Sequence, residues 1–209
     1  MRLVQARSFF SVLPLSYLLA AVFVHGMSED KRSLLDAIVR GNDEVATAIF
    51  HITRTRFAPE YIGERDIPLM YLASAYGLPR LTAALIDAGA DPNVLVSMGG
   101  DAPWLTPLGR AVAEGAETVV AELLRSNKTS LDLASTRFGG DDQEVESERK
   151  TIDQLIAKNI QGLQEQRDLL KAAGRVPSPY SQRGLRAMQS IEAMVKDVRV
   201  AREQLLHVR

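Results

Sequence analysis

The sequence predicts an all-α fold built from helix pairs that repeat along the chain. Hydrophobic residues make up 46% of the 209 residues but aromatic residues only 6%, so Ala, Leu, Val and Ile must fill the core. Stretches in which apolar and polar residues alternate are rare, and so are Val-, Ile- and Thr-rich runs bounded by turn residues, which argues against strands. Three segments also align with one another, which indicates internal repeats.

The repeated unit consists of two helix-like stretches separated by a glycine. Its three copies cover residues 32–53, 67–93 and 106–131. The glycines are 36 and 38 residues apart, and in every copy two large apolar residues follow eight and nine residues later. The glycines are Gly41, Gly77 and Gly115, and the apolar pairs are Ile49-Phe50, Leu85-Ile86 and Leu123-Leu124. Because glycine adopts positive φ without strain, we expect each one to form the tight turn between two antiparallel helices.

This unit resembles the ankyrin repeat, which opens with Thr-Pro-Leu-His-x-Ala and closes with Leu-Leu-x-x-Gly-Ala-x-x-Asn. The third copy opens with Thr106-Pro107-Leu108 and has Ala111 in the alanine position. The second copy closes with Gly89-Ala90-Asp91-Pro92-Asn93. The departures are Gly109 in place of the histidine, Asn127 in place of a closing glycine, and the opening Ile67-Pro68-Leu69 with one extra residue before Gly77.

The resemblance covers about residues 31–135 and implies a solenoid of about three helix pairs. Pro107 would begin its helix, because proline at the first helical position has a preset φ and lacks only an N–H that needs no partner. The small side chains of Ala37, Ala73 and Ala111 would let neighbouring pairs stack closely. Since one pair cannot bury its apolar face alone, about three copies are the working minimum.

The last third of the chain predicts a helical hairpin over residues 141–209. Gly139-Gly140-Asp141-Asp142 separates it from the repeat domain at residues 27–135. Apolar residues at helical spacing predict one helix over residues 142–173 and a second over residues 181–207. The hairpin has two open roles: a cap on the third repeat, or a dimerising coiled coil or partner-binding arm.

A fourth repeat within this hairpin has only weak support. Gly162 and Gly174 are 12 residues apart, as are Gly77 and Gly89. However, Lys158 occupies the alanine position and no Pro-Leu opening precedes it.

Residues 1–26 have the layout of a secretory signal peptide. Arg2 and Arg7 precede an uncharged stretch over residues 9–24, and small residues stand at Val24 and Gly26 before Met27. Since this run contains a proline and is shorter than the about 20 apolar residues of a spanning helix, we expect cleavage and export to the periplasm or beyond. An uncleaved inner-membrane anchor is one alternative. A cytoplasmic protein whose translation starts at Met27 is another.

No pattern for catalysis, cofactor binding or metal binding is found in the sequence. The absence of cysteine excludes disulfides and thiol chemistry. The histidines, His25, His51 and His207, lie far apart, and no Gly-rich phosphate loop, Gly-x-Ser-x-Gly or His-Glu-x-x-His occurs. Without residues 1–26 the 23 basic residues are outnumbered by 26 acidic ones, which argues against nucleic-acid binding. We therefore expect a protein that is not an enzyme.

The resemblance implies that a protein partner binds to the fingers between repeats and to the concave face of the inner helices. Finger 1 covers residues 54–66 and finger 2 covers residues 94–105. Aromatic residues and arginines often anchor interfaces. The finger candidates are Arg54, Arg56, Phe57, Tyr61, Met98, Asp101 and Trp104, and the inner-helix candidates are Met70, Tyr71, Arg110 and Glu114. Phe57, Tyr61 and Trp104 could instead pack beneath their own loops.

The expected function is that of a non-catalytic protein-binding module in the bacterial periplasm. Its partner would be a toxin or enzyme that it inhibits, or a neighbouring envelope protein that it assists. The alternatives are a membrane-anchored structural scaffold that retains the N-terminal segment, and a cytoplasmic ankyrin adaptor.

Overall fold

The computed structural model describes residues 29–53, 61–62, 67–97, 102–137, 148–176 and 179–207. Most of these residues are helical, which confirms the predicted helical character. The described helices are α2 (Glu29–Val39), α3 (Asp43–Thr53), α4 (Leu69–Ala75), α5 (Pro79–Asp87), α6 (Pro107–Glu114), α7 (Glu117–Arg125), α8 (Ile152–Ala172) and α9 (Pro179–His207).

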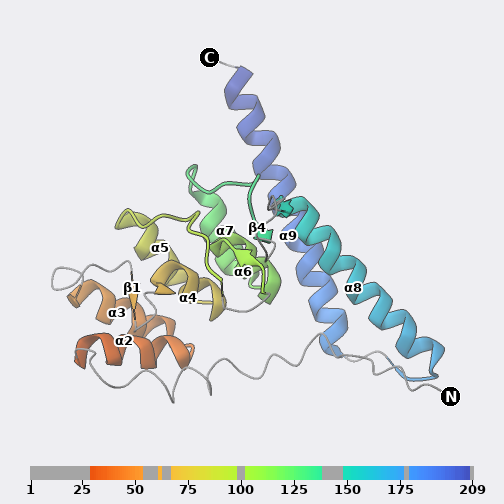
Figure 1. Cartoon of the computed structure of the whole chain (residues 1–209), viewed down its shortest axis with the longest axis horizontal. Coiled ribbons are helices and arrows are strands. Elements are labelled where there is room, and N and C mark those ends of the chain that lie inside the picture. Colours follow the sequence, from red (N-terminus) through yellow and green to blue (C-terminus); the bar gives the residue numbers. More distant parts are fainter. Residues whose placement is uncertain are drawn as a thin grey trace, which may run out of the picture.

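The helices form four consecutive pairs that stack in series (Figure 1). Each pair is an antiparallel hairpin: α2 with α3, α4 with α5, α6 with α7, and α8 with α9. We call α4, α6 and α8 the inner helices, because α4 packs on α6 and α6 on α8. The outer helices α3, α5, α7 and α9 pack on one another in the same order. The main contacts therefore join each pair to its neighbour and not to a common centre.

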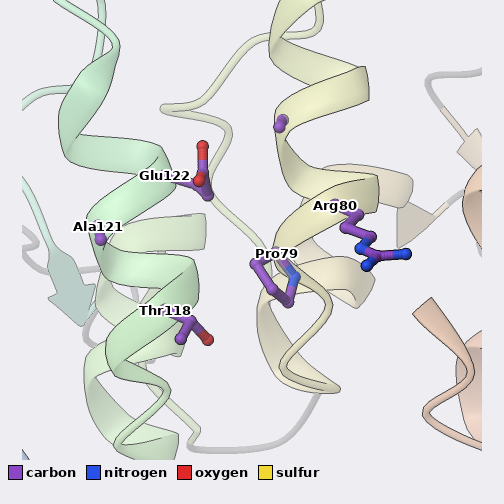
Figure 2. A pocket seen from close by; sticks show the side chains of 6 residues that line it. Pro79, Arg80, Thr118, Ala121 and Glu122 are labelled. Carbon is purple, nitrogen blue, oxygen red and sulfur yellow. The ribbon is translucent and has the colours of Figure 1, made fainter. Parts of the chain in front are cut away.

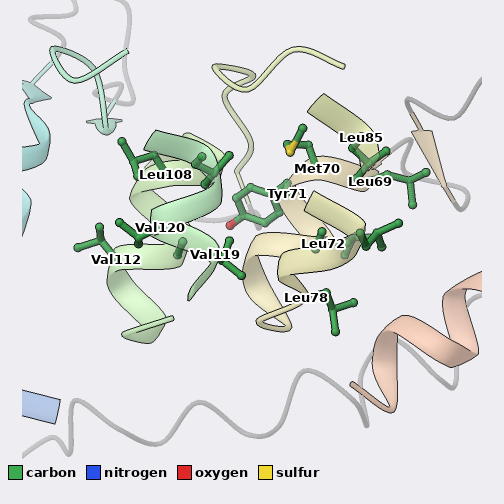
Figure 3. Close-up of a cluster of buried hydrophobic side chains, with 14 of the residues drawn as sticks. Leu69, Met70, Tyr71, Leu72, Leu78, Leu85, Leu108, Val112, Val119 and Val120 are labelled. Atoms are coloured by element: carbon green, nitrogen blue, oxygen red, sulfur yellow. The ribbon is translucent and has the colours of Figure 1, made fainter. Parts of the chain in front are cut away.

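The core lies between successive pairs and is made mainly of aliphatic side chains. Figure 3 shows the second and third pairs, with the ring of Tyr71 between them. Leu69, Leu72, Leu85, Leu108, Val112, Val119 and Val120 are all at most 2% exposed. This packing accounts for the low aromatic content, because closely spaced helix pairs leave room for small and medium side chains.

The turn glycines have the conformation that the sequence predicts. Gly41, Gly77 and Gly115 have φ of 69°, 68° and 69°. In each turn the N–H of the residue after the glycine donates to the carbonyl of an alanine at a distance of 2.9 Å. The three acceptors are Ala37, Ala73 and Ala111, which are also buried at the packing seam. The repeat signal therefore corresponds to one recurring turn geometry.

The structure also contains short strands, which the sequence did not predict. β1 (Tyr61–Ile62) pairs antiparallel with β2 (Ile67–Pro68). β3 (Trp104–Leu105), β4 (Ser135–Arg137) and β5 (Glu148–Lys150) form an antiparallel sheet in the order β3-β4-β5. Strands of two or three residues are too short to produce an alternating pattern in the sequence, and they are few enough that the described chain remains mostly helical, as predicted. β2, β3 and β5 lead into the inner helices α4, α6 and α8, respectively.

The first helix of the C-terminal hairpin begins ten residues later than predicted. The prediction was residue 142, but α8 begins at Ile152, and residues 138–147 lie outside the described part of the chain. Pairing of β5 with β4 holds residues 148–150 in an extended conformation. Thr151 then starts the helix through a capping box, in which it and Gln154 each bond to the other's backbone N–H.

The C-terminal hairpin packs on the third helix pair, with α8 against α6 and α9 against α7, which favours the capping role. Its turn is at Gly174, where φ is 67° and the N–H of Arg175 bonds to the carbonyl of Leu170. Gly162 lies within α8. Helix α8 passes through Gly162 without a turn, so the weak pattern of a fourth repeat is not realised, and the fourth helix pair is the predicted C-terminal hairpin.

Polar side chains connect one helix pair to the next. The carboxylate of Asp43 accepts hydrogen bonds from the backbone N–H groups of Arg80 and Leu81 at 2.8 and 2.9 Å. Asn93 donates to the carbonyl of Lys128 and accepts from the N–H of Ser130. These bonds complete the packing of the apolar seams and specify how neighbouring pairs are aligned.

The predicted signal peptide lies outside the described residues, which begin at residue 29. No helix within the described ranges is both long enough and apolar enough to span a membrane.

Candidate protein-binding surface

Trp104 lies on β3, beside a strand that the sequence did not predict. The register pairs Trp104 with Thr136 of β4, and Thr136 with Arg149 of β5. Directly opposed residues in a sheet point to the same face, so these three form one row across the sheet. Trp104 is 38% exposed and Arg149 is also exposed, whereas Thr136 is buried. The row therefore presents an indole and a guanidinium on either side of a buried threonine.

The start of α6 is hydrogen-bonded to Ala134, the residue before β4, and this holds β3 and β4 together. The N–H of Thr106 donates to the carbonyl of Ala134 at 3.0 Å, and its hydroxyl accepts from the N–H of Gly109 at 3.0 Å. A Cβ at Gly109 would lie 2.1 Å from the Ala134 carbonyl oxygen, so no larger residue fits there without moving the backbone. The close approach of these two backbones explains why a glycine stands at position 109.

Arg110 and Glu114 form an ion pair on the same inner helix. Nη2 of Arg110 lies 2.5 Å from Oε1 of Glu114, and the two side chains are 15% and 39% exposed. The Arg110 guanidinium carbon lies 6.0 Å from the centroid of the Tyr71 ring. Burial raises the pKa of the Tyr71 phenol, and the positive charge of Arg110 opposes that rise. Arg110 therefore connects the core beneath it to the solvent-facing carboxylate of Glu114.

Two of the predicted inner-helix residues belong to the core. Met70 and Tyr71 are 2% and 1% exposed, so neither side chain is accessible to a partner. Both lie on α4, which is enclosed by α5 on one side and α6 on the other. We therefore remove them from the candidate surface, because the repeat pattern alone did not reveal how completely the neighbouring helices cover α4.

The remaining finger candidates lie outside the side chains that the structure describes. Five of them are outside the described residues altogether: Arg54, Arg56, Phe57, Met98 and Asp101. For the sixth, Tyr61, only the backbone is described. The described candidate surface therefore consists of Trp104 on β3 with Arg110 and Glu114 on α6, on either side of the helix cap at Thr106.

Tyr76 was not predicted to belong to this region. It is half-buried at the end of α4, and burial raises the pKa of its phenol, with Arg110 as the largest opposing influence. Its hydroxyl and Nε of Arg110 are buried without a hydrogen-bond partner among the described residues. The sequence did contain a signal, because the residue before the turn glycine is charged in the other two copies (Arg40 and Glu114) but aromatic here.

A groove lies on the other side of the stack, between the outer helices α5 and α7 (Figure 2). Its volume is about 370 Å³, and it is lined by Pro79, Arg80, Ala83, Thr118, Ala121 and Glu122. Across the described ranges, no three His, Asp or Glu side chains are grouped so that they could hold a metal ion. No protein-family model matches the chain, and no curated protein matches it.

Proposed function

We propose that this chain is an ankyrin-type solenoid that binds another protein through the surface around Trp104, Arg110 and Glu114. Three features support the ankyrin assignment: the recurring glycine turns, the stacking of helix pairs in series, and the short strands that precede each inner helix from α4 onward. An array of this kind offers an extended surface for recognition and no enclosed cleft.

The exposure of Trp104 is the observation that carries the binding proposal. A tryptophan side chain is large and apolar, so leaving 38% of it in contact with water forfeits part of its burial free energy. Tryptophan and arginine are the residues that most often dominate interface energetics. A partner that covers Trp104 and approaches Arg149 would recover that burial and gain a charged contact.

The site of action that we propose is the bacterial periplasm, with residues 1–26 as the export signal. The partner would be an envelope protein that this chain assists, or a toxin or enzyme that it inhibits. N-terminal sequencing of the mature protein tests the location. A start at Met27 without membrane association rules out the anchored scaffold. Recovery of that protein in the periplasmic fraction then supports export, whereas recovery in the cytoplasm means that translation starts at Met27.

Site-specific crosslinking tests the binding surface. A photoreactive phenylalanine analogue at position 104 should capture a defined partner in cells, whereas the same analogue at Val45 should not. Val45 is a suitable control because it is 43% exposed and lies at the start of α3, at the opposite end of that helix from finger 1. With the purified partner, Trp104→Ala should weaken binding about 30-fold, the effect of losing about 2 kcal/mol at a hot spot. Equal capture at both positions, or unchanged affinity, would rule out this surface.

A further inference from the structure

The distal part of the C-terminal hairpin projects beyond the stack. We call residues 157–176 and 179–187 the hairpin arm. Helix α8 has 21 residues, whereas α6, on which it packs, has eight. Among the side chains that the structure describes on these two helices, the buried ones are Ile152, Leu155 and Ile156 on α8 and Met188, Ile191 and Val195 on α9, all outside the arm. Figure 1 shows α8 extending past the third helix pair.

The arm is held together by contacts between its own two helices. The methyl carbons of Leu163 on α8 lie 3.7 Å from the position that a Cβ of Gly184 on α9 would occupy. Leu163 and Gly184 are both half-buried, whereas most other arm residues are exposed. The arm is therefore a helical pair that makes no extensive contact with the described part of the stack.

The arm is basic although the chain is slightly acidic. Its acidic residues are only Glu165 and Asp168. Its basic residues are Lys158, Arg167, Lys171, Arg175, Arg183 and Arg186. These six against two leave an excess of four positive charges on the arm, while the whole chain has a net charge of −1. All of the basic side chains except the half-buried Arg167 are exposed. The arm thus has a net positive charge in a chain whose net charge is negative.

Two aliphatic side chains are exposed at the end of the arm, on either side of its turn glycine. Leu169 is 71% exposed and Val176 is 89% exposed. Lys171 and Arg175 lie between them in the sequence, next to Gly174. We call residues 169–176 the arm tip. Exposed aliphatic groups beside cations are suited to the boundary between the headgroups and the acyl chains of a membrane.

We propose that the arm tip docks on the surface of an anionic phospholipid membrane. Leu169 and Val176 enter the interfacial region, and the basic side chains of the arm are attracted to the lipid phosphates. The exposed aliphatic residues favour a membrane over a nucleic acid, because a phosphate backbone offers no apolar medium in which to bury them. This inference is independent of the surface around Trp104 and would place that surface next to a membrane.

A fluorescent probe at the tip tests the docking. Because the chain contains no cysteine, Val176→Cys provides a single labelling site in the full-length gene product, purified as the cell processes it. An environment-sensitive dye at position 176 should shift to shorter wavelength on vesicles of 30% phosphatidylglycerol in phosphatidylcholine. It should not shift on vesicles of pure phosphatidylcholine. The same dye at Ile52→Cys is the matched control, since that side chain is also exposed but lies on α3.

Charge variants measure how much the basic side chains contribute to membrane binding. Lys171→Gln with Arg175→Gln should weaken vesicle binding about 30-fold, since each cation near an anionic surface contributes about fivefold. The control, Arg40→Gln with Arg125→Gln, removes two exposed cations from the stack and should change binding less than twofold. The proposal is overturned if the probe at position 176 remains in water on anionic vesicles, or if the two double variants bind equally. Binding of the arm to double-stranded DNA with no vesicle response would overturn it as well.

Discussion

Gly109 on α6 and Ala134 beside β4 approach so closely that a side chain on the glycine would meet the alanine carbonyl oxygen at 2.1 Å. The same carbonyl accepts hydrogen bonds from the N–H and the hydroxyl of Thr106. Gly109 thus controls both the start of an inner helix and the position of the sheet that carries Trp104.

Gly109→Ala should therefore destabilise the protein strongly. The methyl group displaces the Ala134 backbone and disturbs the cap at Thr106, and we expect a loss of about 3 kcal/mol in the free energy of unfolding. Urea denaturation monitored by circular dichroism measures the change. Gly162→Ala is the control, because Gly162 lies within α8 with open space around its Cβ position. That variant should be more stable by about 0.5–1 kcal/mol. A Gly109→Ala protein as stable as the wild type contradicts the close approach.

Asp43 should contribute to stability as a cap for a helix that is distant in sequence. Helix α5 has no side-chain cap at its own N-cap residue Leu78, and the Asp43 carboxylate bonds to its first N–H groups instead. Asp43→Ala should cost about 1–2 kcal/mol in chemical denaturation. Asp36→Ala removes an exposed carboxylate from an i, i+4 pair with Arg40 and should cost less than about 0.5 kcal/mol. Equal losses in the two variants would show that the hydrogen bonds between Asp43 and α5 contribute no more to stability than the exposed ion pair of Asp36 does.

Arg202 should anchor the C-terminal helix to the third helix pair. Its guanidinium donates to the carbonyls of Ser126 and Thr129 at 2.9 and 2.7 Å, where α7 ends. We expect Arg202→Ala to cost about 2 kcal/mol, since hydrogen bonds from a charged group are the stronger ones. Amide hydrogen exchange should become faster around residues 126–130. Arg125→Ala serves as the comparison, because Arg125 is exposed and pairs with Glu122 within α7. Unchanged exchange in the Arg202 variant would argue against the anchor.

The two tyrosines beneath Arg110 should respond differently to loss of their hydroxyl groups. The Tyr76 hydroxyl is buried without a hydrogen-bond partner in the described part of the chain. The Tyr71 ring lies 6.0 Å from the guanidinium carbon of Arg110, whose positive charge opposes the rise in the pKa of this phenol. Tyr76→Phe should therefore be neutral or stabilising by up to about 1 kcal/mol. Tyr71→Phe should cost about 1 kcal/mol, because it removes the interaction of the buried phenol with the Arg110 guanidinium. Thermal unfolding separates the two cases, and the reverse order would mean that the Tyr76 hydroxyl has a favourable partner and the Tyr71 hydroxyl has none.

The same tyrosines should make the fold sensitive to alkaline pH. Burial raises the pKa of both phenols above the usual 10.0, so the folded chain holds these protons more tightly than the unfolded chain does. As the pH rises above 10, the unfolded chain ionises first, and the stability that is fully present below this pH decreases. The free energy of unfolding of the Tyr71→Phe and Tyr76→Phe double variant should therefore decrease less above pH 10 than that of the wild type. Parallel curves for the wild type and the double variant above pH 10 would contradict this origin.

The repeat pattern predicted the turns correctly because their geometry is local. A residue with positive φ is needed between two antiparallel helices, and glycine meets that need at Gly41, Gly77 and Gly115. The helix before Gly174 ends for the same reason. The start of α8 was predicted incorrectly, because residues 148–150 are held extended by hydrogen bonds to β4, and the residues before the cap at Thr151 carry no sign of that pairing.

The sequence by itself determined the helix pairs and the glycine turns between them, since apolar spacing and backbone freedom are properties of consecutive residues. Only the tertiary structure decided which side chains remain exposed. Met70 and Tyr71 are covered by helices from two neighbouring pairs, whereas Trp104 is left partly in water at the edge of a sheet formed with a strand about thirty residues away. Exposure depends on every element that packs around a residue, and those elements come from distant parts of the chain.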